Sequence, residues 1–270
     1  MQTTSDLWIS LCQELQHKRK AAAPAEHHLA ARQFCEGVAK VFSPISPRLS
    51  AALEIAGDVC QAAGCSDEAV AHFEDALQRN LKSEDFAAAA RVTTKLAFLF
   101  SRQENRAGAR KHFLQAIDLF ESAHDRSQHS MILLQLADLE MNAGDFTACE
   151  QHYQAALDHS VRLHGEKHPT TATICSNFGI AYSAHGDGVN AENFLMRALG
   201  IREQIFGAMH PEVAASLANL AVAYHTGKQN EKAAGYYRAA LQTYAAFQRP
   251  DAPESAAVQA NLTKLEARQK

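Results

Sequence analysis

The sequence predicts an all-α protein, a right-handed superhelical solenoid built from helix-turn-helix repeats. Three observations support this prediction: the composition, a self-similarity with a fixed offset, and glycines and prolines that recur at the joints between helices. Hydrophobic residues make up 47% of the 270 residues, and there are only 13 glycines and 7 prolines. Such a composition is typical of an ordered chain with a continuous core.

The internal repeat is the strongest of these observations. Residues 168–182 match residues 210–224, so that equivalent residues stand 42 positions apart. A further step of 42 reaches Pro253, and steps of 42, 40 and 40 towards the N-terminus keep the pattern as far as Ala56. This register predicts five repeats over residues 48–251 and a C-terminal capping helix, half of a further repeat, over residues 252–270.

Each repeat keeps side chains of the same size at the positions where two stacked helices would meet. A small column consists of Gly57, Ala97, Ala137, Gly179 and Ala221, and a large column consists of Phe73, Phe113, Tyr153, Leu195 and Tyr237. The glycines between the two helices are Gly64, Gly144 and Gly186, and the prolines at the start of first helices are Pro169, Pro211 and Pro253. Small residues allow close helix approach, and proline suits the first helical turn. Each repeat is therefore predicted to be a helix pair that buries its apolar side by stacking on its neighbours.

The N-terminal segment lies outside the repeat. Trp8, Leu11 and Leu15 share one side of an amphipathic helix predicted over residues 6–20, and Lys18, Arg19 and Lys20 follow at its end. One interpretation is a helical cap over residues 1–43, with a second helix over about 25–42 and a proline-containing joint at 44–47. The other is a contact with an acidic membrane or an acidic partner, because a basic end beside an aromatic apolar side suits lipid headgroups.

Several functional classes are disfavoured by the sequence. The net charge of −4 provides no overall attraction for nucleic acid. Apolar runs are too short to span a bilayer and no secretory signal is visible, which predicts a cytoplasmic protein. The nucleotide-binding and hydrolase motifs are missing, so we expect no enzyme and no cofactor. His72, His112 and His152 share a repeat column but would lie too far apart to bind one metal ion, so no metal site is predicted.

The small and aromatic columns resemble the tetratricopeptide repeat. The 42-residue period and the segments 163–169, 197–201, 206–211 and 219–221 are more specifically similar to the repeats of kinesin light chains. The similarity is strongest over residues 130–262. A free-standing array without a heptad coiled coil is most similar to the bacterial kinesin light chain, which accompanies bacterial tubulins.

This resemblance implies a concave groove that binds protein, in which first-helix asparagines bond to an extended peptide backbone. These asparagines map to Asn177, Asn219 and Asn261. Gln135 holds the same position one repeat earlier, and Ser176 stands where the family has another asparagine. A separate basic stripe at Arg102, Arg106 and Arg110 is either a solvated surface or a docking surface for an acidic partner.

The sequence thus predicts a non-enzymatic scaffold or adaptor that acts with bacterial tubulin filaments through its groove. Two alternatives remain open at this stage: a membrane tether that uses residues 6–20, and a cytosolic sensor that closes around a peptide ligand. A filament or membrane partner would place this cytoplasmic protein at the corresponding surface. The oligomeric state is not predicted.

Overall fold

A computed structural model describes residues 4–21, 26–43, 46–247 and 253–267, with the side chains of residues 4, 5 and 19–21 left undescribed. The described residues form thirteen α-helices and no strand, which confirms the predicted all-α class. The helices are α1 (Thr4–Ala21), α2 (His27–Val41), α3 (Pro47–Ala62), α4 (Ser66–Lys82), α5 (Phe86–Arg102), α6 (Arg106–Ser122), α7 (His129–Asn142), α8 (Phe146–His164), α9 (Pro169–His185), α10 (Gly188–Phe206), α11 (Pro211–Thr226), α12 (Asn230–Ala246) and α13 (Pro253–Ala267).

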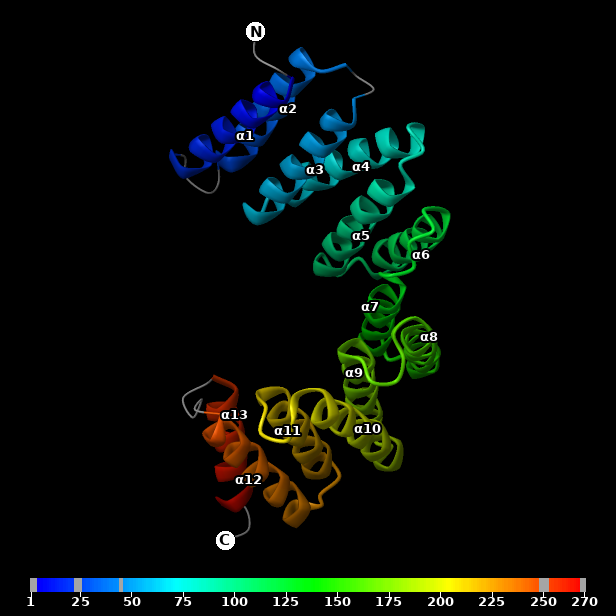
Figure 1. Ribbon diagram of the computed structural model, residues 1–270, viewed down its shortest axis with the longest axis vertical. Helices are drawn as coiled ribbons and strands as arrows, with labels where there is room; N and C mark the ends of the chain where they lie inside the picture. The colour runs from blue at the N-terminus through cyan, green and yellow to red at the C-terminus, as the bar shows by residue number, and fades with distance from the viewer. Residues whose placement is uncertain (1–3, 22–25, 44–45, 248–252, 268–270) are drawn as a thin grey trace. The chain divides into compact units, whose positions relative to one another are not determined.

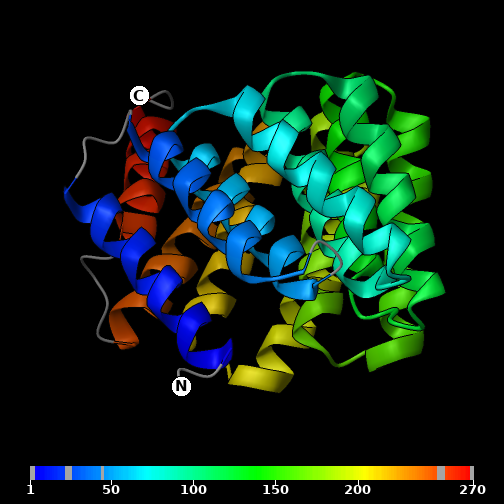
Figure 2. The same ribbon diagram turned by 90° about the horizontal axis from the view of Figure 1, so that it is seen from above.

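The chain divides into two compact units, residues 1–132 and residues 133–270. Within each unit, helices that follow one another along the chain pack side by side (Figures 1 and 2). The first helices of the repeats are α3, α5, α7, α9 and α11, and the second helices are α4, α6, α8, α10 and α12. Helix α13 is one more first helix. The helix-turn-helix repeats are therefore confirmed.

Most second helices, and α5, begin at a polar residue that caps the backbone. Asp145 accepts a hydrogen bond from the N–H of Ala148, and Asp187 accepts one from the N–H of Asn190. Asn105 caps α6 in the same way. These bonds satisfy N–H groups that a helix start would otherwise leave without a partner. The turns before these helices are therefore specified by single residues.

The array begins slightly earlier than the sequence analysis placed it. Helix α3 starts at Pro47, which was assigned to the joint over residues 44–47. The Ser46 hydroxyl accepts a hydrogen bond from the N–H of Arg48, and Pro47 occupies the first turn, so the cap and the proline together start the helix here. The other two joint residues, 44 and 45, and residues 252 and 268–270 of the predicted capping helix lie outside the described residues.

The small and large columns pack against each other within each repeat. All five members of the large column are at most 2% exposed. A Cβ atom added to Gly57 would lie 2.4 Å from the Phe73 ring, and one added to Gly179 would lie 2.7 Å from Cγ of Leu195. Both distances are shorter than van der Waals contact. Glycine is thus required for the separation of the two helices in these repeats.

Helix α1 packs its apolar side on α2. The Trp8 ring lies 5.9 Å from the ring of Phe34, and Leu15 is buried. Leu11 approaches Gly37 so closely that a Cβ atom there would lie 3.1 Å from its Cδ2 atom. The side chains that would have to enter a lipid surface are therefore engaged with α2, which favours the cap interpretation of this segment.

The basic end of α1 is only partly described. Lys18 forms an ion pair with Glu14 at 2.6 Å and donates a hydrogen bond to Gln33 of α2. The side chains of Arg19 and Lys20, two further members of the predicted lipid contact, lie outside the described residues. None of the described helices is both long enough and apolar enough to cross a membrane.

Histidine replaces the usual capping residue at two first helices of the second unit. Nδ1 of His168 accepts a hydrogen bond from the N–H of Thr170, and Nδ1 of His210 accepts one from the N–H of Glu212, both at 3.2 Å. The ring of His168 stacks on His164 at 4.2 Å, and the ring of His210 stacks on Phe206 at 4.6 Å. Both histidines thus act as N-terminal caps of their helices.

The glycine packing predicts opposite effects for two substitutions in the second unit. Gly179→Ala should lower the free energy of unfolding by about 1–3 kcal/mol, because the new methyl group overlaps Leu195. Gly200→Ala should instead raise it by about 0.5–1 kcal/mol, because Gly200 lies within α10 with no atom near its Cβ position. Urea denaturation followed by circular dichroism measures both. Equal effects of the two substitutions would contradict this packing.

The His168 cap predicts a loss of stability in acid. Burial, together with nearby His164, lowers the pKa of His168, and its bonded Nδ1 atom can accept a hydrogen bond only while unprotonated. The contribution of this cap is therefore complete above about 6.5, the ordinary histidine pKa, and is lost as the pH falls through the lower folded-state pKa. The midpoint of thermal unfolding should fall less between pH 7.5 and pH 5.0 for His168→Asn than for the original chain.

A matched histidine serves as the control for this pH effect. His124 lies in a turn at a φ of 55°, where asparagine is readily accepted. His124→Asn should keep the pH dependence of the original chain. The capping role of His168 is refuted if the His168→Asn and original chains lose the same amount of thermal stability on acidification.

Candidate functional site

The first helices of the second unit present two parallel rows of side chains. We call the amide row Gln135, Asn177, Asn219 and Asn261, which lie on α7, α9, α11 and α13 in turn. We call the outer row Asp138, Ile180, Val222 and Lys264, each three residues further along the same helix. Residues three apart lie on the same side of a helix, so the two rows belong to one surface. We refer to this surface as the first-helix face.

The order of these helices follows from their contacts. Leu134 and Ala137 of α7 share a core cluster with Ile174 and Phe178 of α9. The amide of Asn219 on α11 donates a hydrogen bond at 3.0 Å to Ser176 on α9. Leu220 of α11 and the apolar residues of α13 share a further cluster. The helices α7, α9, α11 and α13 are therefore successive neighbours within this unit.

The centre of the first-helix face carries no charge. Helix α9 contains no Asp, Glu, Lys or Arg, and α11 contains only Glu212, which lies in its first turn and pairs with Arg202. Ile180 and Val222 are nevertheless each 45% exposed. A solvent-facing helix surface is usually lined by charged and polar residues. Two neighbouring helices that expose amides and branched aliphatic side chains instead form a surface suited to another protein.

The predicted binding residues take two different places on this surface. Asn177, Asn219, Asn261 and Gln135 are half-buried, whereas Ser176 is only 3% exposed. The Ser176 hydroxyl accepts one N–H of Asn219, which leaves the carbonyl oxygen and the second N–H of this amide available to a ligand. Ser176 therefore orients Asn219 rather than facing a ligand itself.

Tyrosine and carboxylate pairs join the first helices of this face to second helices. Tyr153 donates to Asp138, and Tyr182 donates to Glu150, each at 2.5 Å. Tyr224 bonds to Glu192 one repeat after the second pair. Burial first, and then the carboxylate, raises the pKa of each of these tyrosines, which keeps the phenols neutral. The repeat pattern of the sequence does not reveal these carboxylate partners.

The amide row has a different counterpart in the first unit. Lys95 occupies the equivalent position and pairs with Glu54 at 2.8 Å and Asp58 at 2.7 Å on the preceding first helix. Burial acts to lower the pKa of Lys95, but the hydrogen bonds to Asp58 and Glu54 outweigh it and raise the pKa. The first helices of this unit thus carry an ion-pair network where the second unit carries neutral amides.

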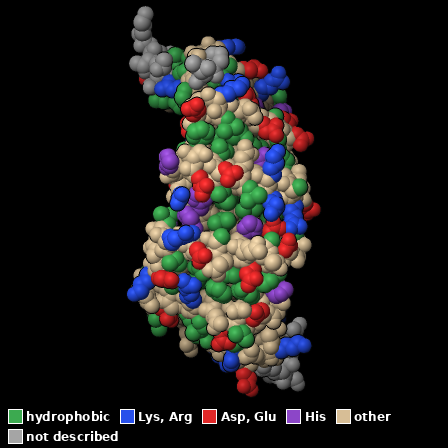
Figure 3. Space-filling view, turned by 90° about the vertical axis from the view of Figure 1, so that its right-hand side faces the viewer, with side chains coloured by type: hydrophobic (Ala, Val, Ile, Leu, Met, Phe, Trp, Pro, Cys, Tyr) green, Lys and Arg blue, Asp and Glu red, His purple; other side chains and the backbone are tan. Residues whose placement is uncertain are grey.

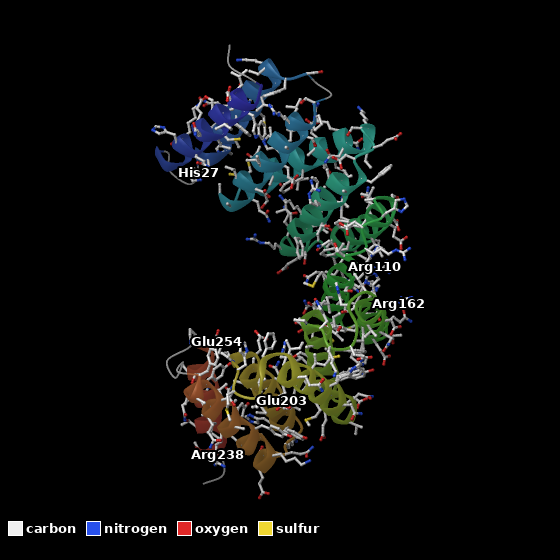
Figure 4. All side chains as sticks on the ribbon, viewed as in Figure 1. His27, Arg110, Arg162, Glu203, Arg238 and Glu254 are labelled. Atoms are coloured by element: carbon white, nitrogen blue, oxygen red, sulfur yellow. The ribbon has the colours of Figure 1, made fainter. Side chains whose placement is uncertain are left out.

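The predicted basic stripe lies at the turn between α5 and α6. Arg102, Arg106 and Arg110 are all exposed, and Arg110 is labelled on α6 in Figure 4. Both Arg106 and Arg110 already interact with other groups of the chain. On the side of the molecule drawn in Figure 3, acidic, basic and hydrophobic side chains are interspersed among the described residues. Exposure and interactions within the chain are typical of a solvated helix surface, which is one of the two interpretations of this stripe.

A groove of about 920 Å³ lies between the second helices α4 and α6 of the first unit. Glu74, Asp75 and Asp118 line it together with Lys111 and His112. Asp75 is already paired with Arg79 at 2.9 Å. The lining thus mixes charges of both signs, which gives no preference for one kind of charged partner.

Reactive side chains are not concentrated anywhere in the described part of the chain. Burial raises the pKa of the Cys60, Cys149 and Cys175 thiols to about 11, so these sulfurs stay protonated and poorly nucleophilic. Among the residues described, no group of three or more His, Cys, Asp or Glu side chains is arranged to hold a metal ion.

A family model matches part of the chain. The sequence model of the tetratricopeptide repeat matches residues 128–204 and 186–246. No curated protein matches the sequence significantly. The family match covers α7 to α12, and so includes the first-helix face except for its last helix.

Solved structures share the fold over most of the chain. The crystal structure of BtubC (BKLC) from P. vanneervenii has a TM-score of 0.67 and 21% sequence identity, and the match covers 92% of this chain and 93% of that one. The apo form of RapI has a TM-score of 0.69 and 16% identity, covering 90% of this chain and 66% of that one. YrrB, described as a tetratricopeptide repeat protein with an unusual peptide-binding site, has a TM-score of 0.50 and 15% identity, covering 85% and 99%. At these identities the likeness concerns the fold. We conclude that residues 128–246 belong to the tetratricopeptide repeat family and that the chain has the all-helical fold of tetratricopeptide repeat proteins.

Proposed function

We propose that this protein is a non-enzymatic scaffold that binds an extended segment of a partner protein on its first-helix face. The observation that carries this proposal is the uncharged surface of α9 and α11, where Ile180 and Val222 stay exposed beside Asn177 and Asn219. Half-buried amides can bond to a peptide backbone, while exposed aliphatic side chains pack against its side chains. The peptide-binding site reported for YrrB is consistent with this use of the fold.

As the partner we propose a bacterial tubulin filament. The support is the sequence resemblance to bacterial kinesin light chains and the shared fold with BtubC over 92% of the chain. An exposed tail or loop of a filament subunit would supply the extended segment. Because a filament repeats its subunits, many copies of the scaffold would bind along it, and weak single contacts would suffice for stable association.

The partner proposal predicts co-sedimentation with polymerised bacterial tubulin. The purified chain should pellet with the polymer, and the triple variant Asn177→Ala, Asn219→Ala, Asn261→Ala should bind at least about tenfold more weakly. Loss of three backbone-bonding amides at about 0.5–1.5 kcal/mol each accounts for a change of this size. The measurement is the pelleted fraction as a function of polymer concentration.

A matched amide variant controls for the number of substitutions. Gln154, Gln204 and Gln242 are exposed on the second helices of the same unit, and their triple alanine variant should pellet like the original chain. Thermal unfolding of both variants establishes that each is folded. If the original chain stays in the supernatant at every polymer concentration, the filament partner is excluded. Equal pelleting by the asparagine and glutamine variants would exclude the first-helix face.

A further inference from the structure

We infer that the first-helix face selects a polarised segment, with a basic side chain at one end, two aliphatic side chains in the centre and an acidic side chain at the other end. This inference rests on the proposed function and specifies the ligand of the same surface. It comes from the outer row, whose four members change from Asp138 through Ile180 and Val222 to Lys264.

The centre of the row disfavours a charged ligand residue. A charge that loses its water against Ile180 and Val222 would find no opposite charge on α9 or α11, because Glu212 is held by Arg202. Desolvating a charge without a partner is unfavourable by several kcal/mol, whereas an aliphatic side chain gains from burial at the same place. The two central positions of the ligand are thus aliphatic.

The two ends of the row supply opposite charges. Lys264 is exposed on α13 and forms no ion pair with the described residues, and the neighbouring Glu266 pairs with Arg238 at 2.6 Å. Asp138 on α7 is half-buried and accepts a hydrogen bond from Tyr153, which fixes its carboxylate and still leaves lone pairs for another donor. A ligand that spans the row therefore meets a fixed anion at α7 and a cation at α13.

The spacing of the helices sets the spacing of these ligand residues. Packed helices lie about 10 Å apart, and an extended chain advances about 3.3 Å per residue. Successive outer-row contacts therefore correspond to about three ligand residues. A segment of about ten residues would place its basic, aliphatic, aliphatic and acidic side chains at about every third position, while the amide row bonds to its backbone.

A selection from a library of displayed random twelve-residue peptides tests this inference on the full chain. Peptides enriched by the original chain should carry the polarised pattern, read in either direction along the peptide. Lys264→Glu should bind a selected peptide at least about tenfold more weakly, and replacement of the acidic residue of that peptide by lysine should restore binding. Asp138→Asn, which keeps an acceptor for Tyr153, should weaken the preference for the basic residue.

A charge reversal elsewhere in the unit provides the control. Lys167 is exposed in the turn between α8 and α9 and lies outside both rows, so Lys167→Glu should select the same peptides as the original chain. Enriched peptides with a charge at a central position would overturn the inference. An affinity for the selected peptide that Lys264→Glu leaves unchanged would also overturn it. If such peptides still depend on Asn177, Asn219 and Asn261, the proposed function survives this result. An absence of any enriched peptide that depends on this surface would overturn both.

Discussion

The contact between a small residue on one helix and a large residue on the next determines the rest of this structure. Gly57 faces the ring of Phe73 in the first unit, and Gly179 faces Leu195 in the second, at distances that exclude even one added methyl group. Such contacts bring the two helices of a repeat together and bury the large column. Repeated within each unit, they place equivalent helices beside each other, so that side chains 40 residues apart in the first unit and 42 residues apart in the second form rows on a surface.

The function we propose follows from what those rows contain. In the first unit, Lys95 occupies the equivalent position and forms ion pairs with Glu54 and Asp58. The second unit has amides and exposed aliphatic side chains in its rows. The Asn219 amide uses only one of its N–H groups in a hydrogen bond within the chain. The same backbone arrangement therefore produces one surface on which Lys95 is paired with two carboxylates and another whose uncharged side chains are available to the ligand that we propose. Ser176 and the Tyr182–Glu150 pair hold the second surface in place.

Much of this could be predicted from the sequence, because the repeat register and the size columns are local patterns that packing preserves. The asparagine positions and the pairing of Trp8 with an apolar helix side also follow from such patterns. The partners of individual polar groups could not be predicted in this way. The bond of Asn219 to Ser176 and the Lys95 network depend on residues far apart in sequence whose side-chain directions are set only after the helices stack.

We claim above all that the exposed side chains of Ile180 and Val222 serve to bind a partner and are not needed for the stability of the fold. The double variant Ile180→Glu, Val222→Glu tests it most directly, with thermal unfolding and peptide selection measured on the same sample. The account predicts a thermal midpoint close to that of the original chain, since both side chains are already 45% exposed, together with the loss of all peptides that the original chain enriches. Enrichment of the same peptides by this folded double variant would contradict it.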